Sequence, residues 1–327
     1  MTKPIAISSG DPCGVGPEIS VKAWEELKNE LAFVLYTSFS FMESLFPNIP
    51  FIKINNPQEA NKVMKIGLPI FDIPFSEKPI VGETKNKFAH ETISSIKLAT
   101  ASCLSGQSRA LCTNPINKYN LKNYAGFKFS GHTDFLKHLT SSENVVMMLA
   151  SNEFKVIPAT IHLSLFEAIK LINKDLIKNT ILTCHNSLIN QFKISDPKIF
   201  VSGLNPHAGE NGLFGREEIN IISPVIEDLR RKGIDVNGPF SADSLFHKKM
   251  RECYDAVICM YHDQALIPIK TVSFDDAVNI TLGLPFVRTS PDHGTAMDIA
   301  GKNLASAASL ISAIRLANKL TSNNNEH

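Results

Sequence analysis

Strand-like and helix-like segments alternate along most of this chain, and that alternation restricts the possible folds more than any other feature. The apolar run 4–9 precedes a helical pattern over 17–28, and a second apolar run, 31–37, follows it. An amphipathic segment over 91–105 then leads into the run 109–112. Strands that are separated by helices pair in parallel, because each crossover returns the chain to the same end of the sheet. The sequence therefore predicts an α/β fold with a parallel sheet.

The rest of the chain continues this alternation with one exception. The runs 144–150 and 155–160 are separated by a turn-sized gap, which predicts an antiparallel hairpin. The remaining elements are expected as strands over 198–203, 255–260 and 278–282 and as helices over 165–172, 174–191, 216–231 and 303–320. We expect a second domain to begin near Gly126. The two domains are expected to be lobes that share interleaved strands.

Composition places the chain among ordinary globular proteins. Its 327 residues are 43% hydrophobic and 20% charged, and the formal net charge of +1 favours neither nucleic acid nor an acidic membrane surface. The amino terminus does not resemble a signal peptide and no apolar run is long enough to span a membrane, so we expect a cytoplasmic protein. Six cysteines without CxxC spacing are expected to be mostly buried, reduced thiols.

Three histidines stand far apart in the chain, each beside small or helix-breaking residues. His207 and His262 follow the strand-like runs 198–203 and 255–260, so both are expected at the carboxyl edge of a parallel sheet, where α/β folds bind ligands. Together with His162 they indicate one divalent metal site gathered by the fold. The chain has no HExxH motif and no paired CxxC, so ordinary hydrogen-bonding histidines are the alternative.

Two glycine-containing motifs open expected helices. In 9–18, glycines allow a sharp turn after the first strand, Pro17 suits the first helical turn, and Glu18 favours the positive end of the helix. This segment matches neither a dinucleotide fingerprint nor a phosphate loop, so a structural turn is the alternative. In 130–134, Gly131 would expose backbone amides while His132 and Thr133 bind a small polar ligand; Thr133 or Asp134 as a simple helix cap is the alternative.

Three further residues are candidates for binding an anion: Lys270, Asn279 and Arg288. Lys270 and Arg288 stand within apolar, strand-like stretches, and a charge buried there must be paired or bound to a ligand. An internal salt bridge to Asp275 or Asp276 is the alternative.

The polar, glycine-rich loop 290–303 has the composition of loops that bind a ligand or cover a cleft.

Six motifs, taken together, resemble the 4-hydroxythreonine-4-phosphate dehydrogenases of the vitamin B6 pathway, from end to end of the chain. The motifs lie at 10–18, 130–133, 204–210, 238–243, 261–264 and 288–296. The first and last also resemble the wider isopropylmalate and isocitrate dehydrogenase group.

The resemblance implies a two-lobed α/β/α subunit of the isocitrate/isopropylmalate dehydrogenase type, with the active site in the cleft between the lobes. The first lobe, on the cofactor side, would comprise 1–126 and 283–327, and the second, 127–282, would carry the metal, substrate and dimer contacts. A homodimer with shared active sites is also implied. In that family the metal ligands match His162, His207 and His262, and the substrate contacts match His132, Thr133, Lys270, Asn279 and Arg288.

The activity implied is a metal-dependent, NAD- or NADP-linked oxidation of 4-phosphooxy-L-threonine. The product, 2-amino-3-oxo-4-phosphooxybutanoate, would lose carbon dioxide to give 3-amino-2-oxopropyl phosphate. One zinc, magnesium or cobalt ion would polarise the reacting hydroxyl. Asp243 and Asp263 are candidates for moving the proton or orienting a ligand histidine. By analogy with the wider group, the cofactor would lie along His293, Gly294, Asp298 and Asn303.

Three other functions stay open. Threonate or erythronate 4-phosphate could be the substrate, since close relatives of the family act on such phosphorylated sugar acids. A three-histidine metal with an open water position could serve a hydrolase, which needs no nicotinamide. In a non-catalytic sugar-phosphate binding protein, the metal would only stabilise the fold.

Overall fold

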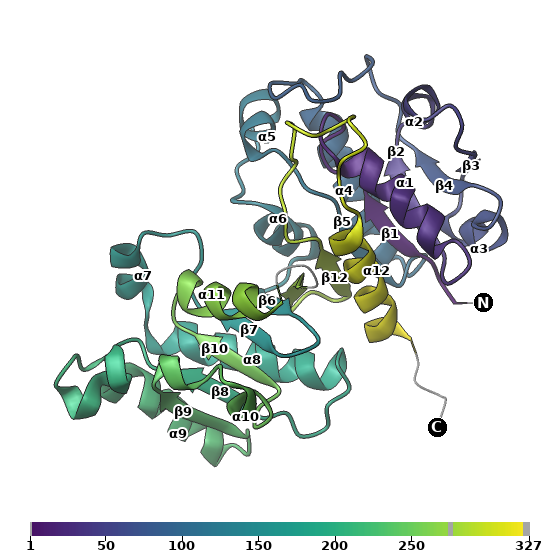
Figure 1. Cartoon of the computed structure of the whole chain (residues 1–327). Helices are drawn as coiled ribbons and strands as arrows, with labels where there is room; N and C mark the ends of the chain where they lie inside the picture. Colours follow the sequence, from purple (N-terminus) through teal and green to yellow (C-terminus); the bar gives the residue numbers. More distant parts are fainter. Residues whose placement is uncertain (1, 274–276, 323–327) are drawn as a thin grey trace. The chain divides into compact units, whose positions relative to one another are not determined.

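A computed structural model describes residues 2–273 and 277–322 and divides the chain into two compact units, each a sheet covered by helices (Figure 1). Unit 1 consists of Met1–Ser142 and Leu284–His327, and unit 2 of Glu143–Gly283. The expected α/β class is confirmed. The chain passes to unit 2 after Ser142 and not near Gly126, because helix α6 packs against helix α4 of unit 1.

The sheet of unit 1 has the strand order β3-β4-β2-β1-β5-β12. Parallel pairs join β1 to β2 and β5, β4 to β2 and β3, and β12 to β5, as the sequence predicted for this region. The strands are β1 (Ile5–Ser8), β2 (Phe33–Thr37), β3 (Phe51–Ile54), β4 (Leu68–Asp72), β5 (Ala110–Thr113) and β12 (Val287–Ser290). Every residue of β1, β2, β5 and β12 is buried, as expected for parallel strands that are covered on both faces.

The helices of unit 1 are α1 (Gly16–Leu27), α2 (Phe39–Leu45), α3 (Ala60–Val63), α4 (Ala89–Leu104), α5 (Lys118–Ala125), α6 (His132–Thr140) and α12 (Ala308–Thr321). The crossover through α1, from β1 to β2, and the crossover through α4, from β4 to β5, run in opposite directions along the sheet. Because such crossovers are right-handed, α1 and α4 belong on opposite faces. Helix α12 packs against α1, β5 and β12.

The sheet of unit 2 has the order β11-β6-β7-β10-β8-β9. Its strands are β6 (Val146–Ala150), β7 (Lys155–Pro158), β8 (Ile199–Ser202), β9 (Val236–Phe240), β10 (Ala256–Cys259) and β11 (Val278–Leu282). The predicted hairpin is confirmed, since β6 and β7 pair antiparallel; β6 also pairs antiparallel with β11. The strands β7, β10, β8 and β9 pair in parallel.

The helices of unit 2 are α7 (Leu165–Leu171), α8 (Lys174–Asn190), α9 (Ser223–Arg231), α10 (Lys248–Arg251) and α11 (His262–Val272). Helix α11 packs on β7 and β10, and α8 packs on β6, β10 and β11. The buried side chains of Ala265 and Ile269 join α11 to a hydrophobic cluster that includes Val156 and Val257 of the sheet. The carboxyl ends of β7 and β10 are thus held beside the start of α11.

Three helical segments differ from the prediction. The segment expected as one helix over 216–231 begins as a π-helix, Glu218–Ile222, before α9. The last helix begins at Ala308, because a turn at 301–303, in which Asn303 is left-handed with a φ of 58°, is followed by the irregular segment 304–307. The apolar stretch around Lys270, interpreted as strand-like, belongs to α11, which accommodates Pro268 in its interior.

Five of the six cysteines are buried and all six are free, as predicted; Cys253 is exposed. Within residues 2–273 and 277–322, no helix combines the length and apolar character that a membrane crossing requires.

Candidate active site

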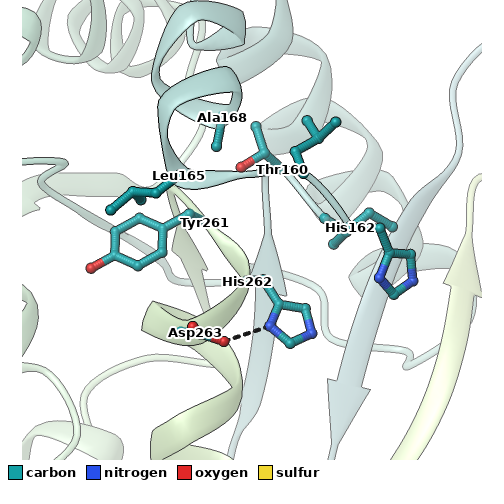
Figure 2. A pocket seen from close by; sticks show the side chains of 9 residues that line it. Thr160, His162, Leu165, Ala168, Tyr261, His262 and Asp263 are labelled. Carbon is teal, nitrogen blue, oxygen red and sulfur yellow. Dashed lines mark hydrogen bonds and ion pairs between the residues drawn. The ribbon is translucent and has the colours of Figure 1, made fainter.

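His162 and His262 lie together in a pocket of about 220 Å³ in unit 2 (Figure 2). His162 follows β7, and His262 is the first residue of α11, just after β10. Their ring centroids are 6.0 Å apart. A metal that is bonded to one nitrogen of each ring at about 2 Å would hold the centroids roughly 5–6.5 Å apart. The distance between the two rings is therefore compatible with one shared ion.

His207 follows β8, the other parallel neighbour of β10. The three histidines thus come after three adjacent parallel strands, β7, β10 and β8, which meets the expectation of a shared carboxyl edge. The His207 ring lies 5.9 Å from the ring of Phe214 and is not among the residues that line the pocket. Among residues 2–273 and 277–322, no three His, Cys, Asp or Glu side chains are grouped closely enough to hold a metal. The structure brings two of the three histidines together.

Strained backbone surrounds two of these histidines. His162 has a φ of 54°, and the residues 207–211 all have positive φ, with 53° at His207. L-residues rarely adopt this left-handed conformation, which costs roughly 1–3 kcal/mol per residue and tends to occur at functional sites. The surrounding structure must therefore hold both histidines in place.

The buried carboxylate of Glu218, only 3% exposed, holds the His207 loop. It accepts hydrogen bonds from the backbone amides of Leu204 and Asn205, both at 2.8 Å, and from the Asn205 side chain at 3.0 Å. Gly209 must be glycine here, because a Cβ at that position would approach Glu218 Oε2 to 2.6 Å. Glu218 was not singled out from the sequence, since nothing in a charged helix start marks it as buried.

Gln264, the last residue of the 261–264 motif, connects the ends of two strands. Its Oε1 accepts hydrogen bonds from Ser202 Oγ and from the Met260 amide, both at 2.7 Å. Its Nε2 donates to the Gly203 carbonyl at 2.9 Å. Gln264 therefore fixes the end of β8, before His207, relative to the end of β10, before His262.

The two candidate catalytic aspartates lie near different histidines. Asp263 Oδ1 is 2.7 Å from His262 Nδ1, which leaves Nε2 of that ring available for a metal (Figure 2). Asp243 is exposed and accepts a hydrogen bond from Ser241 Oγ at 2.6 Å. That hydrogen bond, with a smaller contribution from nearby His207, lowers the pKa of Asp243 below its ordinary value.

The five candidate substrate residues are divided between the units. Lys270, in α11, and Asn279, in β11, belong to unit 2, and the buried Asn279 Oδ1 has no hydrogen-bond partner among the described residues. The proposed salt-bridge partners Asp275 and Asp276 lie outside the described residues. His132, Thr133 and Arg288 belong to unit 1.

Arg288 is a buried cation on β12. The side chain is 3% exposed, and its Nη2 donates to Thr113 Oγ1 at 2.6 Å. Burial lowers its pKa to about 10, so the guanidinium stays charged at neutral pH. The expectation of an embedded charge within a strand is confirmed for Arg288.

His132 begins α6, so Gly131, not Thr133 or Asp134, is the residue before the helix. His132 as a whole is half-buried, yet its Nε2 is buried without a hydrogen-bond partner among the described residues. Burial, together with the nearby charges of Arg288 and Lys118, lowers the pKa of His132 well below its ordinary value. The ring is therefore neutral at pH 7.

The loop that leads to the last helix is bonded to the amino-terminal motif of unit 1. The Val15 amide donates to the Thr295 carbonyl at 3.0 Å. Further along the loop, Glu18 Oε1 accepts from the Ala305 amide at 3.0 Å, and Lys22 Nζ donates to the Ala305 carbonyl at 2.7 Å. The two segments that resemble the wider dehydrogenase group are thus one structural feature.

The four candidate cofactor residues His293, Gly294, Asp298 and Asn303 are exposed on this loop. A Cβ added to Gly294 would meet no atom within 4 Å, so the space beside it is open. Asn303 also lines a pocket of about 370 Å³ whose walls include Glu18, Phe46 and Val81.

The protein is therefore a two-unit α/β protein. Unit 2 has a histidine-lined pocket at the carboxyl ends of its strands. Unit 1 has the positive charges of Arg288 and Lys118 near the neutral His132. A family model described as "Pyridoxal phosphate biosynthetic protein PdxA" matches residues 29–317, and the chain belongs to this family. The family expected from the sequence motifs is confirmed.

Relatives match the chain along nearly its whole length. It is 47% identical over 313 residues to a 4-hydroxythreonine-4-phosphate dehydrogenase of Ruegeria sp. (strain TM1040), across 96% of this chain and 95% of the relative. It is 44% identical over 326 residues to the enzyme of that name from Caulobacter vibrioides, across 98% of each chain. The crystal structure of the enzyme of that name from Klebsiella pneumoniae superposes with a TM-score of 0.89 at 36% identity, covering 98% of this chain and 100% of that one.

The depressed pKa of His132 predicts an acid-sensitive contribution to stability. The unfolded chain takes up a proton near pH 6.5 that the folded protein does not, so stability falls as the pH drops below about 6.5 and is unaffected above it. Between pH 6.5 and 5, we expect the free energy of unfolding of His132→Gln to fall by about 1 kcal/mol less than that of the wild type. Urea unfolding at both pH values, with a chelator present, measures this loss.

The exposed His138 on the same helix provides the control, and His138→Gln should leave the pH dependence unchanged. An identical pH dependence in wild type and His132→Gln would contradict a neutral, buried His132.

Proposed function

We propose that this protein is a metal-dependent 4-hydroxythreonine-4-phosphate dehydrogenase of pyridoxal phosphate biosynthesis. It oxidises the C3 hydroxyl of 4-phosphooxy-L-threonine and passes a hydride to NAD or NADP. The resulting β-keto acid loses carbon dioxide and gives 3-amino-2-oxopropyl phosphate. The observation that carries the proposal is the position of three histidines after the adjacent strands β7, β10 and β8, in a chain whose relatives bear this enzyme's name.

The residues of unit 2 fit a divalent metal. His162, His207 and His262 would hold it, and three imidazoles favour zinc or cobalt over magnesium. The spacing of the His162 and His262 rings and the strained backbone at His162 and His207 support this assignment. When bound, a cation with neutral ligands favours loss of the hydroxyl proton and polarises the new carbonyl group.

The candidate substrate residues carry polar groups that suit an anionic substrate. Arg288 supplies a fixed positive charge, and the neutral His132 and the Thr133 hydroxyl supply hydrogen bonds, in unit 1. In unit 2, Lys270 would contribute a cation, and the carbonyl oxygen of Asn279, which has no partner among the described residues, would accept a hydrogen bond from the substrate's amino group. Binding of the charged ends of the substrate orients its C3 hydroxyl for reaction.

The two aspartates have separate proposed roles. Asp263 would hold the His262 ring in the orientation and tautomer that a metal ligand requires. Asp243, an exposed carboxylate near His207, would accept the proton released from the hydroxyl. The nicotinamide cofactor would lie along His293, Gly294, Asp298 and Asn303, where the open space beside Gly294 supports close approach.

We also propose a homodimer with shared active sites. Four large apolar side chains of helix α7 are between 40% and 68% exposed: Leu165, Phe166, Ile169 and Leu171. A monomeric soluble protein rarely exposes so much apolar surface on one short helix. Leu165 also lines the pocket with His162 and His262, so a partner covering α7 would reach the edge of the candidate metal site.

The proposed reaction can be followed by the absorbance of the reduced nicotinamide. We expect reduction with 4-phosphooxy-L-threonine, release of one carbon dioxide per hydride, and much slower turnover of threonate and erythronate 4-phosphates. Faster turnover of either sugar acid would reassign the substrate. Release of inorganic phosphate without nicotinamide reduction would replace the dehydrogenase with a hydrolase.

Replacement of His162, His207 or His262 by alanine should weaken metal binding at least about 10–100-fold and lower kcat with it, because each change removes a ligand. Metal content after dialysis against a buffered metal ion provides the measurement. His247→Ala, an exposed histidine of the same unit, should behave as wild type. Normal metal content in all three variants would eliminate the proposed site.

The dimer is tested by Phe166→Glu, which places a charge on the apolar face of α7 and should give monomers in sedimentation velocity. Ile66→Glu, at a residue that is 66% exposed in unit 1, is the control and should remain dimeric. Wild-type protein that sediments as a monomer at assay concentration would contradict the homodimer.

A further inference from the structure

Lys118 lies directly over the backbone that leads into His132. It is the first residue of α5 and follows β5 after a short connection. A Cβ added to Gly131 would lie 3.3 Å from Lys118 Cε and 3.5 Å from Lys118 Nζ. Gly131 has an extended φ of 170°, which any residue can adopt. A side chain at position 131 would therefore displace the lysine side chain from its place beside this backbone.

The Lys118 ammonium belongs to the same electrostatic environment as His132 and Arg288. Both positive charges contribute, after burial, to the lowered pKa of the His132 ring. Within residues 2–273 and 277–322, Lys118 Nζ makes no hydrogen bond or ion pair, and the side chain is exposed. Beside it, the buried Nε2 of His132 lacks a hydrogen-bond partner among those same residues. An anion placed here would meet two cations and an unsatisfied imidazole nitrogen.

Local helix stability does not account for a lysine at this position. Asn117 already caps α5, because its side chain accepts a hydrogen bond from the Asn120 amide. A positive charge in the first turn opposes the helix dipole, whereas Lys122, in the last turn, favours it. Lys118 is thus mildly unfavourable for its own helix, and a ligand of negative charge would offset that cost.

We propose that Lys118 is a phosphate-binding residue of this enzyme, acting with His132 and Arg288 on the phosphate group of the substrate. A phosphate monoester carries about 1.5–2 negative charges at neutral pH, so one guanidinium does not neutralise it. A flexible ammonium that approaches from α5 supplies the second charge, while the buried Arg288 supplies the first. This inference rests on the proposed function, which requires a phosphorylated substrate.

The test compares Lys118→Met with Lys122→Met, a matched change one turn along the same helix. Inorganic phosphate is the probe, titrated calorimetrically into the protein without nicotinamide. Loss of one charge-assisted contact should weaken phosphate binding about 10–100-fold in Lys118→Met. Lys122→Met should bind phosphate as wild type does, and Lys118→Arg should recover part of the affinity.

Two further readouts separate binding from structure and from the proposed reaction. Lys118→Met should melt at or above the wild-type temperature, and its KM for the phosphorylated substrate should rise while the KM for the nicotinamide does not. Unchanged phosphate affinity and KM in an active enzyme would overturn the role of Lys118 and leave the proposed function intact. Phosphate binding that depends on Lys118 in a protein without dehydrogenase activity would retain the anion site and reject the proposed function.

Discussion

The parallel pairing of β10 with β7 on one side and β8 on the other is the constraint on which the candidate metal site depends. Parallel strands end at the same edge of a sheet, so the residues that follow them come to one edge although they are far apart in sequence. His162, His207 and His262 occupy these positions. The apolar residues of β8 and β10 therefore contribute to the core of unit 2 and also determine where its candidate metal site lies.

Polar groups at this edge hold backbone that would otherwise relax. The positive φ values at His162 and through 207–211 are unfavourable for L-residues, and they persist because neighbouring groups restrain them. Glu218 binds the start of the His207 loop through two amides, and Gln264 fastens the ends of β8 and β10. Changes to these residues would move the histidines without removing them.

Much of the fold can be predicted from the sequence, because the spacing of apolar residues reflects which side chains are buried. The short apolar runs became strands close to the predicted limits, and the hairpin of β6 and β7 followed from the short gap between its strands. Lys270 was misinterpreted, because Pro268 is unfavourable inside a helix and its neighbours are apolar, whereas packing of Ala265 and Ile269 on the sheet stabilises the helix. The start of α12 was also missed, since a left-handed Asn303 leaves no periodic signal.

The site was less predictable than the fold, because its supporting residues act through tertiary contacts. Glu218 looks like an ordinary helix residue, and Lys118 like an ordinary surface lysine, until the loops that they contact are known. The proposed chemistry requires three imidazoles that hold one metal. X-ray absorption spectroscopy of the zinc- or cobalt-loaded protein measures its ligands most directly. We predict a shell with three imidazole nitrogens at about 2.0–2.1 Å and the remaining ligands oxygen. A shell of oxygen ligands with one imidazole or none would contradict a three-histidine site.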